Sequence, residues 1–193
     1  MTLRLARVTS LTIAIVACNF GVGRPQGRVA TWLNEAKPAS WNKPGLPLPA
    51  APRIQGNTDP RCRDLARPPE SEPDKRLRDQ GWDLIGAYQG GWQILVIGGA
   101  AGYDGMCRPL QYQDFVFVRG VFAGTLSPQP MDSRSDGALG RVYLQSESRL
   151  TAEYARYADK DPACCPSSTT SVQFEITRDG FLRPLSASNS SNK

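Results

Sequence analysis

From Gly81 to Leu185 the chain alternates short runs of β-branched and aromatic residues with turn residues. Runs of this length predict strands, and Gln89–Gly91 and Arg119–Gly120 predict hairpin turns. In Val172–Ile176 apolar and polar residues alternate, which indicates one buried and one wet face. The sequence therefore predicts a mainly β, or α+β, domain with a small antiparallel sheet. The expected strands are residues 82–88, 92–97, 113–118, 121–126, 141–145, 150–157, 172–177 and 181–185.

A short helix is expected just before this sheet. Ser71 suits an N-cap, and Pro73 and Asp74 suit the first helical turn. Gly81 suits the position that follows the last turn. Because Leu77 is the helix's only large apolar residue, we expect the helix to lie on the surface of the sheet.

The N-terminus resembles a leader for export. Arg4 and Arg7 precede the apolar stretch Val8–Ala17, which is too short for a membrane-spanning helix of roughly 20 residues. Ile15–Cys18 resembles the bacterial lipobox, which implies cleavage before Cys18 and a diacylglyceryl thioether on its sulfur. Two or more acyl chains give stable membrane anchoring. The alternatives are an ordinary secretory signal, cleaved near residue 17 or 21, and a retained cytosolic N-terminus.

The chain has five cysteines. If Cys18 carries the lipid, four cysteines remain that can form disulfides. In an exported chain, Cys62, Cys107, Cys164 and Cys165 predict two disulfides that staple the domain. A Cys164–Cys165 bond would close a strained ring outside the usual Cα separation of about 4.4–6.8 Å. We therefore expect one of the two adjacent cysteines to bond Cys62 and the other to bond Cys107, in either order.

The composition divides the chain into four parts. Residues 1–17 form the leader, and residues 18–70 a lipidated N-terminus and proline-rich tether; ten of the sixteen prolines lie between Pro25 and Pro73. Residues 71–185 form the stapled domain, and residues 186–193 a disordered tail. Trp32 and Trp41 are unusual in a spacer, so this segment is expected either to dock onto its own domain or to meet a partner.

Charge and histidine content exclude several classes of function. The net charge of +5 falls to +3 when the leader is removed, and basic residues are interspersed with acidic ones. This pattern does not predict a nucleic-acid partner. Histidine is absent, which excludes mechanisms that need an imidazole base and removes the commonest zinc ligand. No cofactor and no metal site are expected.

Three weaker motifs each have a plain structural interpretation. Gly98–Gly102 lacks the spacing of a phosphate-binding loop and is expected to be a loop that brings Cys107 to its bridge. Asp159 and Asp161 suggest a calcium loop, but the other oxygen ligands of such a site are missing, so a polar loop is preferred. Four aromatic residues either form a binding surface or fill the core. They are Trp82, Trp92, Tyr154 and Tyr157.

Part of the chain resembles a known family. The element Tyr157–Ser167, with its Cys-Cys-Pro-Ser run, and the paired-strand pattern Phe115–Thr125 resemble the LppP/LprE family of bacterial lipoproteins over residues 81–185. The resemblance implies an envelope lipoprotein of unassigned activity and brings no catalytic residues. Members of that family carry a histidine in the paired-strand motif, where this chain has Val118, so no role is transferred to that position.

These features together predict a non-enzymatic, lipid-anchored envelope protein that acts as a binding or structural module. Its expected partners are the membrane, through the anchor, and an envelope protein or cell-surface component. One alternative is a hydrolase without histidine that uses paired carboxylates. Another is a thiol–disulfide redox protein that uses Cys164 and Cys165. The carboxylates considered for the hydrolase are Asp104, Asp114, Glu153 and Glu175.

Overall fold

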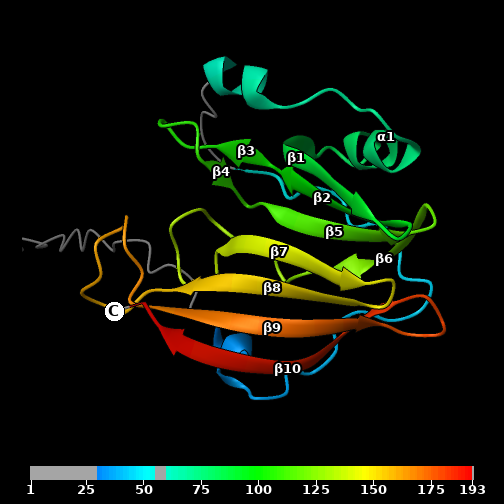
Figure 1. Cartoon of the computed structure of the whole chain (residues 1–193). Helices are drawn as coiled ribbons and strands as arrows, with labels where there is room; N and C mark the ends of the chain where they lie inside the picture. Colours follow the sequence, from blue (N-terminus) through cyan, green and yellow to red (C-terminus); the bar gives the residue numbers. More distant parts are fainter. Residues whose placement is uncertain (1–29, 55–59, 193) are drawn as a thin grey trace, which may run out of the picture.

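The computed structural model describes residues 30–54 and 60–192, which form two antiparallel four-stranded sheets packed face to face (Figure 1). The first sheet has the order β1-β2-β5-β6, and the second has the order β10-β9-β8-β7. The mainly β prediction is confirmed. The first sheet contains β1 (Asp83–Gly91), β2 (Ile94–Ala100), β5 (Gln113–Val118) and β6 (Val121–Thr125). The second contains β7 (Leu139–Ser146), β8 (Arg149–Arg156), β9 (Ser168–Ile176) and β10 (Leu182–Ser191).

The smaller elements lie outside these two sheets. A two-stranded ribbon pairs β3 (Gly102–Tyr103) with β4 (Pro109–Leu110). The α-helix is α1 (Glu72–Asp79), and the 3-10 helices are η1 (Thr31–Asn34) and η2 (Pro60–Leu65). No helix in residues 30–54 or 60–192 is long and apolar enough to cross a membrane.

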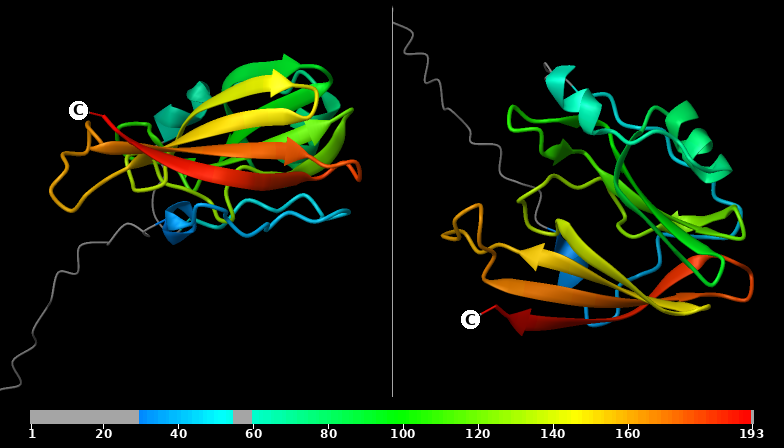
Figure 2. Two further views of the ribbon diagram at one scale, coloured as in Figure 1. Left: turned by 60° about the horizontal axis from the view of Figure 1, so that its bottom comes forward. Right: turned by 45° about the horizontal axis from the view of Figure 1, so that its top comes forward.

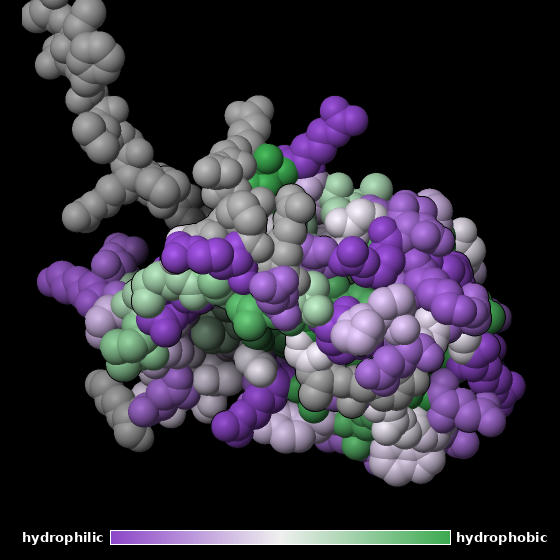
Figure 3. All heavy atoms as spheres, turned by 90° about the horizontal axis from the view of Figure 1, so that it is seen from above, coloured by the Kyte–Doolittle hydropathy of each residue, from purple (hydrophilic) through white to green (hydrophobic). Residues whose placement is uncertain are grey.

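Both faces of the first sheet are buried. Successive side chains of a strand point to opposite faces, so Leu95 and Phe115 face α1 while Val96 and Val116 face the second sheet. The molecule therefore has three layers, with α1 outermost, the first sheet in the middle and the second sheet below it (Figure 1). Figure 3 looks onto the helical layer and shows mostly hydrophilic residues, with a few scattered apolar ones.

The second sheet has one buried and one wet face, as the alternation in β9 predicts. Val172 and Phe174 are fully buried, whereas Gln173 between them is exposed. Leu150 and Tyr154 of β8 continue the buried face. This inner face packs against the first sheet. The side chains between the two sheets form the largest apolar cluster in the described residues.

The two predicted hairpins form, and one of their turns shifts along the chain. Arg119–Gly120 connects β5 to β6 with φ angles of 50° and 78°, values typical of a type I′ turn. Between β1 and β2 the turn is Trp92–Gln93, with φ angles of 48° and 63°, instead of Gln89–Gly91. Gly90 and Gly91 stay in the ladder and pair with the next strand. A Cβ at Gly91 would lie 3.5 Å from Leu144 of β7, an ordinary van der Waals distance, so this residue faces the second sheet.

The helix forms where the sequence predicts it. Ser71 and Asp74 form a capping box, and Pro73 lies in the first turn. Gly81 follows the helix with a φ of +87°. Leu77 is completely buried against the outer face of the first sheet, where it contacts the cluster around Trp82.

Residues 30–54 pack along the sandwich, whereas the sequence predicts a spacer here. We call this segment the N-terminal strap; Figure 2 shows it in blue to cyan beside β10 and continuing toward the helices. Leu33 is 1% exposed in the core between the sheets, and the amide of Ala187 in β10 donates to the carbonyl of Ala36 at 2.9 Å. Of the two alternatives for Trp32 and Trp41, docking onto their own domain is therefore the one observed.

The strap also joins the edge of the first sheet. The Nδ2 of Asn42 donates to the carbonyl of Thr125 at 3.0 Å, and the Thr125 amide donates back to Asn42 Oδ1 at 3.0 Å. Trp41 Nε1 donates to the same carbonyl at 3.1 Å. Further along, Trp82 Nε1 donates to the carbonyl of Pro49 at 2.8 Å. These bonds satisfy buried polar groups, which explains why a proline-rich segment holds a fixed position.

The C-terminal residues form a strand instead of the disordered tail expected from Ser186. β10 runs to Ser191 and pairs with β9 as far as Ser168. The ladder is made by backbone groups, so serine and asparagine side chains do not prevent it. A polar strand suits the edge of a sheet, where few side chains need to be buried.

Candidate functional site

The cysteines pair differently from the sequence prediction. Cys62 bonds Cys107, with an S–S distance of 2.02 Å and a Cα–Cα distance of 5.1 Å. Cys164 is paired with its neighbour Cys165, whose Cα lies 3.8 Å away. The expected bridges from the adjacent pair to Cys62 and Cys107 do not form, because η2 and the β3–β4 ribbon lie above the first sheet while the β8–β9 loop extends from the second (Figure 1).

A disulfide map of the purified, non-reduced protein is expected to show this pairing. Proteolysis should yield one cross-linked species that joins the Cys62 and Cys107 peptides. A single peptide should contain both Cys164 and Cys165 and weigh two hydrogens less than its reduced form. Mass spectrometry before and after reduction makes the measurement, and a cross-link between the two pairs would contradict it.

The run Gly98–Gly102 is mostly strand, whereas a loop was expected. Gly98 and Gly99 lie in β2, and Gly102 begins β3. Cys107 lies in the turn between β3 and β4 with a φ of 59°. The glycines allow close packing: a Cβ at Gly99 would come within 3.1 Å of the Phe115 ring.

Three of the four carboxylates considered for hydrolysis lie at exposed or partly exposed positions, bonded to neighbouring side chains. Asp104 accepts from Arg108 Nε at 2.6 Å, and this bond lowers the pKa of its carboxyl. Glu175 of β9 pairs with Arg183, and Glu153 of β8 accepts a long hydrogen bond of 3.4 Å from the hydroxyl of Tyr143. The fourth, Asp114, lies on the inner face of the first sheet.

The loop with Asp159 and Asp161 is a polar loop held by its own hydrogen bonds. Asp161 Oδ2 accepts from the amides of Ala158 at 2.8 Å and Ser167 at 2.9 Å. These hydrogen bonds hold the pKa of Asp161 below its ordinary value. Across residues 30–54 and 60–192, no group of three or more acidic or cysteine side chains is arranged to hold a metal ion.

The four aromatic residues divide between core and surface. Trp82 and Tyr154 are fully buried and fill the two sides of the first sheet. Tyr157 donates its hydroxyl hydrogen to the carbonyl of Ala163. Trp92, at the tip of the first hairpin, is 57% exposed. They do not form a common binding surface.

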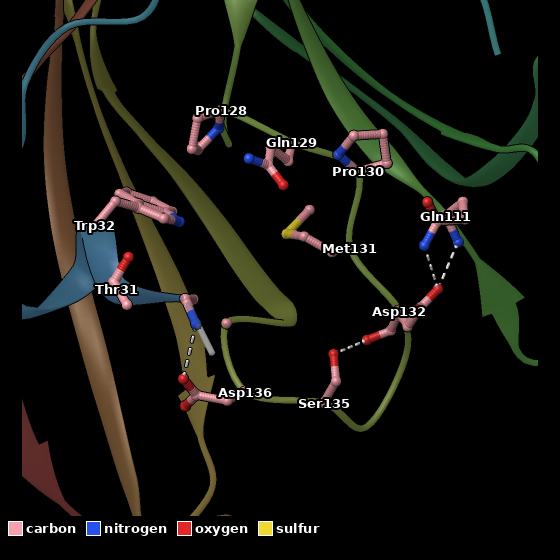
Figure 4. A pocket seen from close by; sticks show the side chains of 12 residues that line it. Thr31, Trp32, Gln111, Pro128, Gln129, Pro130, Met131, Asp132, Ser135 and Asp136 are labelled. Atoms are coloured by element: carbon pink, nitrogen blue, oxygen red, sulfur yellow. Dashed lines mark hydrogen bonds between the residues drawn. The ribbon is translucent and has the colours of Figure 1, made fainter. Parts of the chain in front are cut away.

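A pocket of about 200 Å³ opens where the strap enters the domain. Trp32 and Met131 point into it from opposite sides (Figure 4). The Trp32 ring is held edge-to-face by Trp41 and Tyr154, with centroids 4.9 and 5.1 Å away. An aromatic wall with nearby amide and carboxylate groups suits a small ligand that has an apolar face and hydrogen-bonding groups.

The acids of this Trp32 pocket have structural partners. Asp136 accepts from Arg156 Nε at 2.8 Å and from the amide of Ala30 at 3.1 Å, so it fixes the start of the strap. Asp132 Oδ1 accepts from the amide of Gln111 at 2.8 Å (Figure 4). Neither acid was singled out in the sequence, because their partners lie far along the chain.

A second hollow, of about 270 Å³, lies between the two sheets on the side of β1 and β7. We call it the inter-sheet cleft. Its apolar walls come from Ile85 and Val96 of the first sheet and from Leu139 and Val142 of the second. Asp114 lies among these residues.

Asp114 is the most perturbed acid in the described part of the chain. Burial raises the pKa of its carboxyl to about 7. Burial, and next the nearby Asp114, also raise the pKa of Tyr112 and Tyr154. The Tyr112 hydroxyl donates to the carbonyl of Leu139 at 3.1 Å, which links the residue just before β5 to β7 beside the cleft. A carboxyl that titrates near neutrality in a cleft is typical of a functional site.

The sequence pointed to Asp114 only as one of four acids. In Asp114–Val118 it precedes a buried alternation, so the period of two places it on the face of Val116 and Val118. The sequence alternation therefore predicts the face of the sheet on which Asp114 lies. It does not predict the cleft, because the opposite wall comes from β7, which lies in the other sheet.

Comparison with known proteins agrees with the resemblance seen in the sequence. The model of the family described as LppP/LprE lipoprotein matches residues 91–179. No curated protein and no solved structure matches the chain. The matched segment runs from the end of β1 through β9, and so includes Asp114, the Trp32-pocket residues Met131 and Asp136, and the Cys164–Cys165 pair. Residues 91–179 are therefore similar to the LppP/LprE lipoprotein family.

Proposed function

We propose that the chain is an exported envelope protein, anchored to a cell membrane by lipid on Cys18, whose two-sheet domain acts by binding. The lipobox-like Ile15–Cys18 and the match to a lipoprotein family support the anchor. Cys18 and the leader, residues 1–17, lie outside the described residues. The partner is an envelope protein or cell-surface component.

The position of the strap carries this proposal. Because the strap is built into the domain from Ala30 onward, only residues 19–29 separate the domain from Cys18. Eleven residues reach at most about 40 Å even when fully extended. A lipid on Cys18 would therefore hold the domain close to the bilayer, with the Trp32 pocket at the end nearest to the anchor.

Binding is favoured over catalysis by the chemistry that the domain offers. Histidine is absent, and three of the four candidate acids are bonded to neighbouring side chains at exposed or partly exposed positions. The domain instead offers the Trp32 pocket and the inter-sheet cleft, both lined by apolar and polar groups. Hollows of this composition are typical of small-molecule sites.

The Cys164–Cys165 pair favours a thiol–disulfide function as the second candidate. Both residues are exposed in the β8–β9 loop. A partner dithiol would reduce the bond with two electrons and two protons, giving thiols on Cys164 and Cys165 and a disulfide on the partner. The disulfide map distinguishes the roles: mixed or free thiols at this pair favour redox work, and a stable bond favours a structural role.

The Cys18→Ser variant is expected to leave the membrane fraction. Without its thiol the chain has no acceptor for the diacylglyceryl group, so the hydrophobic anchor is lost. Fractionation of the native host followed by immunoblotting makes the measurement, and intact-mass analysis reports the lost lipid. Asn19→Ser, which leaves Cys18 in place, is the control and should remain with the membrane. Retention of Cys18→Ser at the membrane, unchanged, would overturn the anchoring proposal.

A further inference from the structure

Asp114 is a carboxyl on the largely apolar inner face of the first sheet. Its neighbours on this face of the first sheet are Val96 of β2, Val116 of β5 and Ile85 of β1. Its carboxyl accepts no hydrogen bond from the described part of the chain, and burial is the one cause of its raised pKa. Asp114 is partly exposed through the cleft, and a carboxyl without a partner beside apolar walls is costly, which calls for an explanation beyond folding.

The space beside this carboxyl is kept open by glycine. Gly98 lies directly opposite Asp114 in the β2–β5 ladder. A Cβ at Gly98 would come within 3.3 Å of Asp114 Oδ1 and 3.1 Å of Ile85 Cγ1. Glycine at this position therefore leaves room next to the carboxyl, inside the inter-sheet cleft of about 270 Å³.

Among the side chains that the structure describes, none forms an ion pair with Asp114. Tyr112, just before β5, and Tyr154 of β8 are titratable neighbours; tyrosine is uncharged at neutral pH, and the pKa of both is raised further. Arg141 of β7 is among the residues that line the cleft, but its side chain is exposed and interacts with Tyr143 and Glu153 instead of Asp114.

The acidic surroundings extend to the loop that follows β6. Asp132 in this loop also raises the pKa of Tyr112, so it adds negative charge near the cleft. The cleft thus combines apolar walls with a carboxyl that pairs with no cation in the described part of the chain. It suits a cationic group and disfavours an anion.

We propose that the inter-sheet cleft binds a ligand that carries a primary ammonium group on a short apolar body. The ammonium pairs with the Asp114 carboxylate, and the apolar body packs against Val96, Leu139 and Val142. The proposal rests on the proposed binding function and names its ligand class, but it is independent of the lipid on Cys18. One carboxylate suffices for an ammonium ion, whereas a metal ion needs more ligands.

The expected loss of affinity follows from the type of hydrogen bond that Asp114 would make with the ammonium group. Charge-assisted hydrogen bonds contribute more than neutral ones, so removing the charge on Asp114 should weaken binding by about 10- to 100-fold. Affinity should also rise between pH 6 and pH 8. The free carboxyl, with a pKa of about 7, must lose its proton to pair with the ammonium, which stays protonated throughout this range.

The experiment uses the mature chain with Cys18→Ser, which carries no acyl group to compete for the cleft. n-Hexylammonium is the probe, with n-hexanol and hexanoate as neutral and anionic probes of the same length. Titration calorimetry at pH 6, 7 and 8 should show hexylammonium binding that strengthens with pH, weaker binding of hexanol and no binding of hexanoate. Asp114→Asn should lose the pH dependence and most of the affinity. Glu153→Gln, on the outer face of the second sheet, is the matched control and should bind normally.

A measurement on the unmutated cleft covers the case in which Asp114→Asn does not fold. Carbon-13 NMR of the Asp114 carboxyl should show its pKa fall when hexylammonium is added, because the bound cation favours the ionised form. An unchanged Asp114 titration, equal affinity for hexanol, or no binding of any probe would overturn the proposal. These results are distinct from retention of Cys18→Ser at the membrane, which would remove the anchor and leave the cleft proposal standing.

Discussion

Replacing Asp74 with alanine is expected to lower the free energy of unfolding by about 3–5 kcal/mol, the usual cost of removing one partner of a buried ion pair. The Asp74 side chain is completely buried and pairs with Arg67, whose side chain is 15% exposed. Arg67 donates through both terminal nitrogens, at 3.0 and 2.6 Å. The amides of Glu70 and Ser71 donate to the same carboxylate at 2.9 and 3.1 Å. Its loss leaves several donors unsatisfied at the start of α1.

The control for this variant is Glu72→Ala in the same helical turn. Glu72 pairs with Lys75 on the surface, where both side chains are largely exposed, so its removal should cost at most about 1 kcal/mol. Urea unfolding followed by circular dichroism measures both variants. Equal losses for Asp74→Ala and Glu72→Ala would show that the buried pair does not stabilise the helix.

Asp74 is also expected to make the free energy of unfolding decrease at acidic pH. Burial by itself would raise its pKa, but hydrogen bonds from Arg67, Glu70 and Ser71 outweigh burial, and the folded pKa lies below the unfolded one. The contribution of Asp74 is therefore fully present above its unfolded pKa of about 4 and is lost as pH falls through the folded value. Asp74→Ala should lose less stability than the unmutated chain when pH is lowered from 5 to 2.

Leu33→Ala is expected to lower the free energy of unfolding by about 2–5 kcal/mol, although the residue lies in a proline-rich segment. Leu33 is 1% exposed and belongs to the cluster between the two sheets, together with Tyr154 and Phe174. Truncating it leaves a cavity that the surrounding strands fill only in part.

Leu46→Ala is the matched control, since it removes the same atoms from the same strap. Leu46 is 40% exposed, so its truncation should change stability by less than about 1 kcal/mol. Thermal and urea unfolding of both variants make the comparison. If Leu33→Ala were as mild as Leu46→Ala, residues 30–54 would behave as a spacer and not as part of the core.

Local patterns predicted the local elements well. The capping residues around Ser71 place α1, and the Arg119–Gly120 pair places the turn between β5 and β6. The alternation in Val172–Ile176 identifies the buried face of β9. These predictions succeed because each depends on neighbours within a few positions in the chain.

Long-range features were predicted poorly, for one shared reason. The prolines and glycines of the strap show no helical or strand periodicity, so the sequence predicts a tether. Asn42 and Trp41 are nevertheless held by hydrogen bonds to Thr125, more than eighty positions away. The cysteine pairing depended on which sheet each cysteine lies beside. The polar composition of the end of β10 predicts a disordered tail. Its order comes from backbone pairing with β9, which side-chain composition does not reveal.

The sequence by itself determined the class of fold, the helix, most of the strands and the family to which residues 91–179 are similar. It also set the expectation of a lipid anchor at Cys18, which stays a prediction. The tertiary structure alone decided that residues 30–54 complete the core, that Cys62 bonds Cys107, and that Asp114 lies in a cleft between the two sheets. The physical reason is that burial, pairing and local charge depend on which surfaces meet when the two sheets pack, and strands far apart in the sequence supply those surfaces.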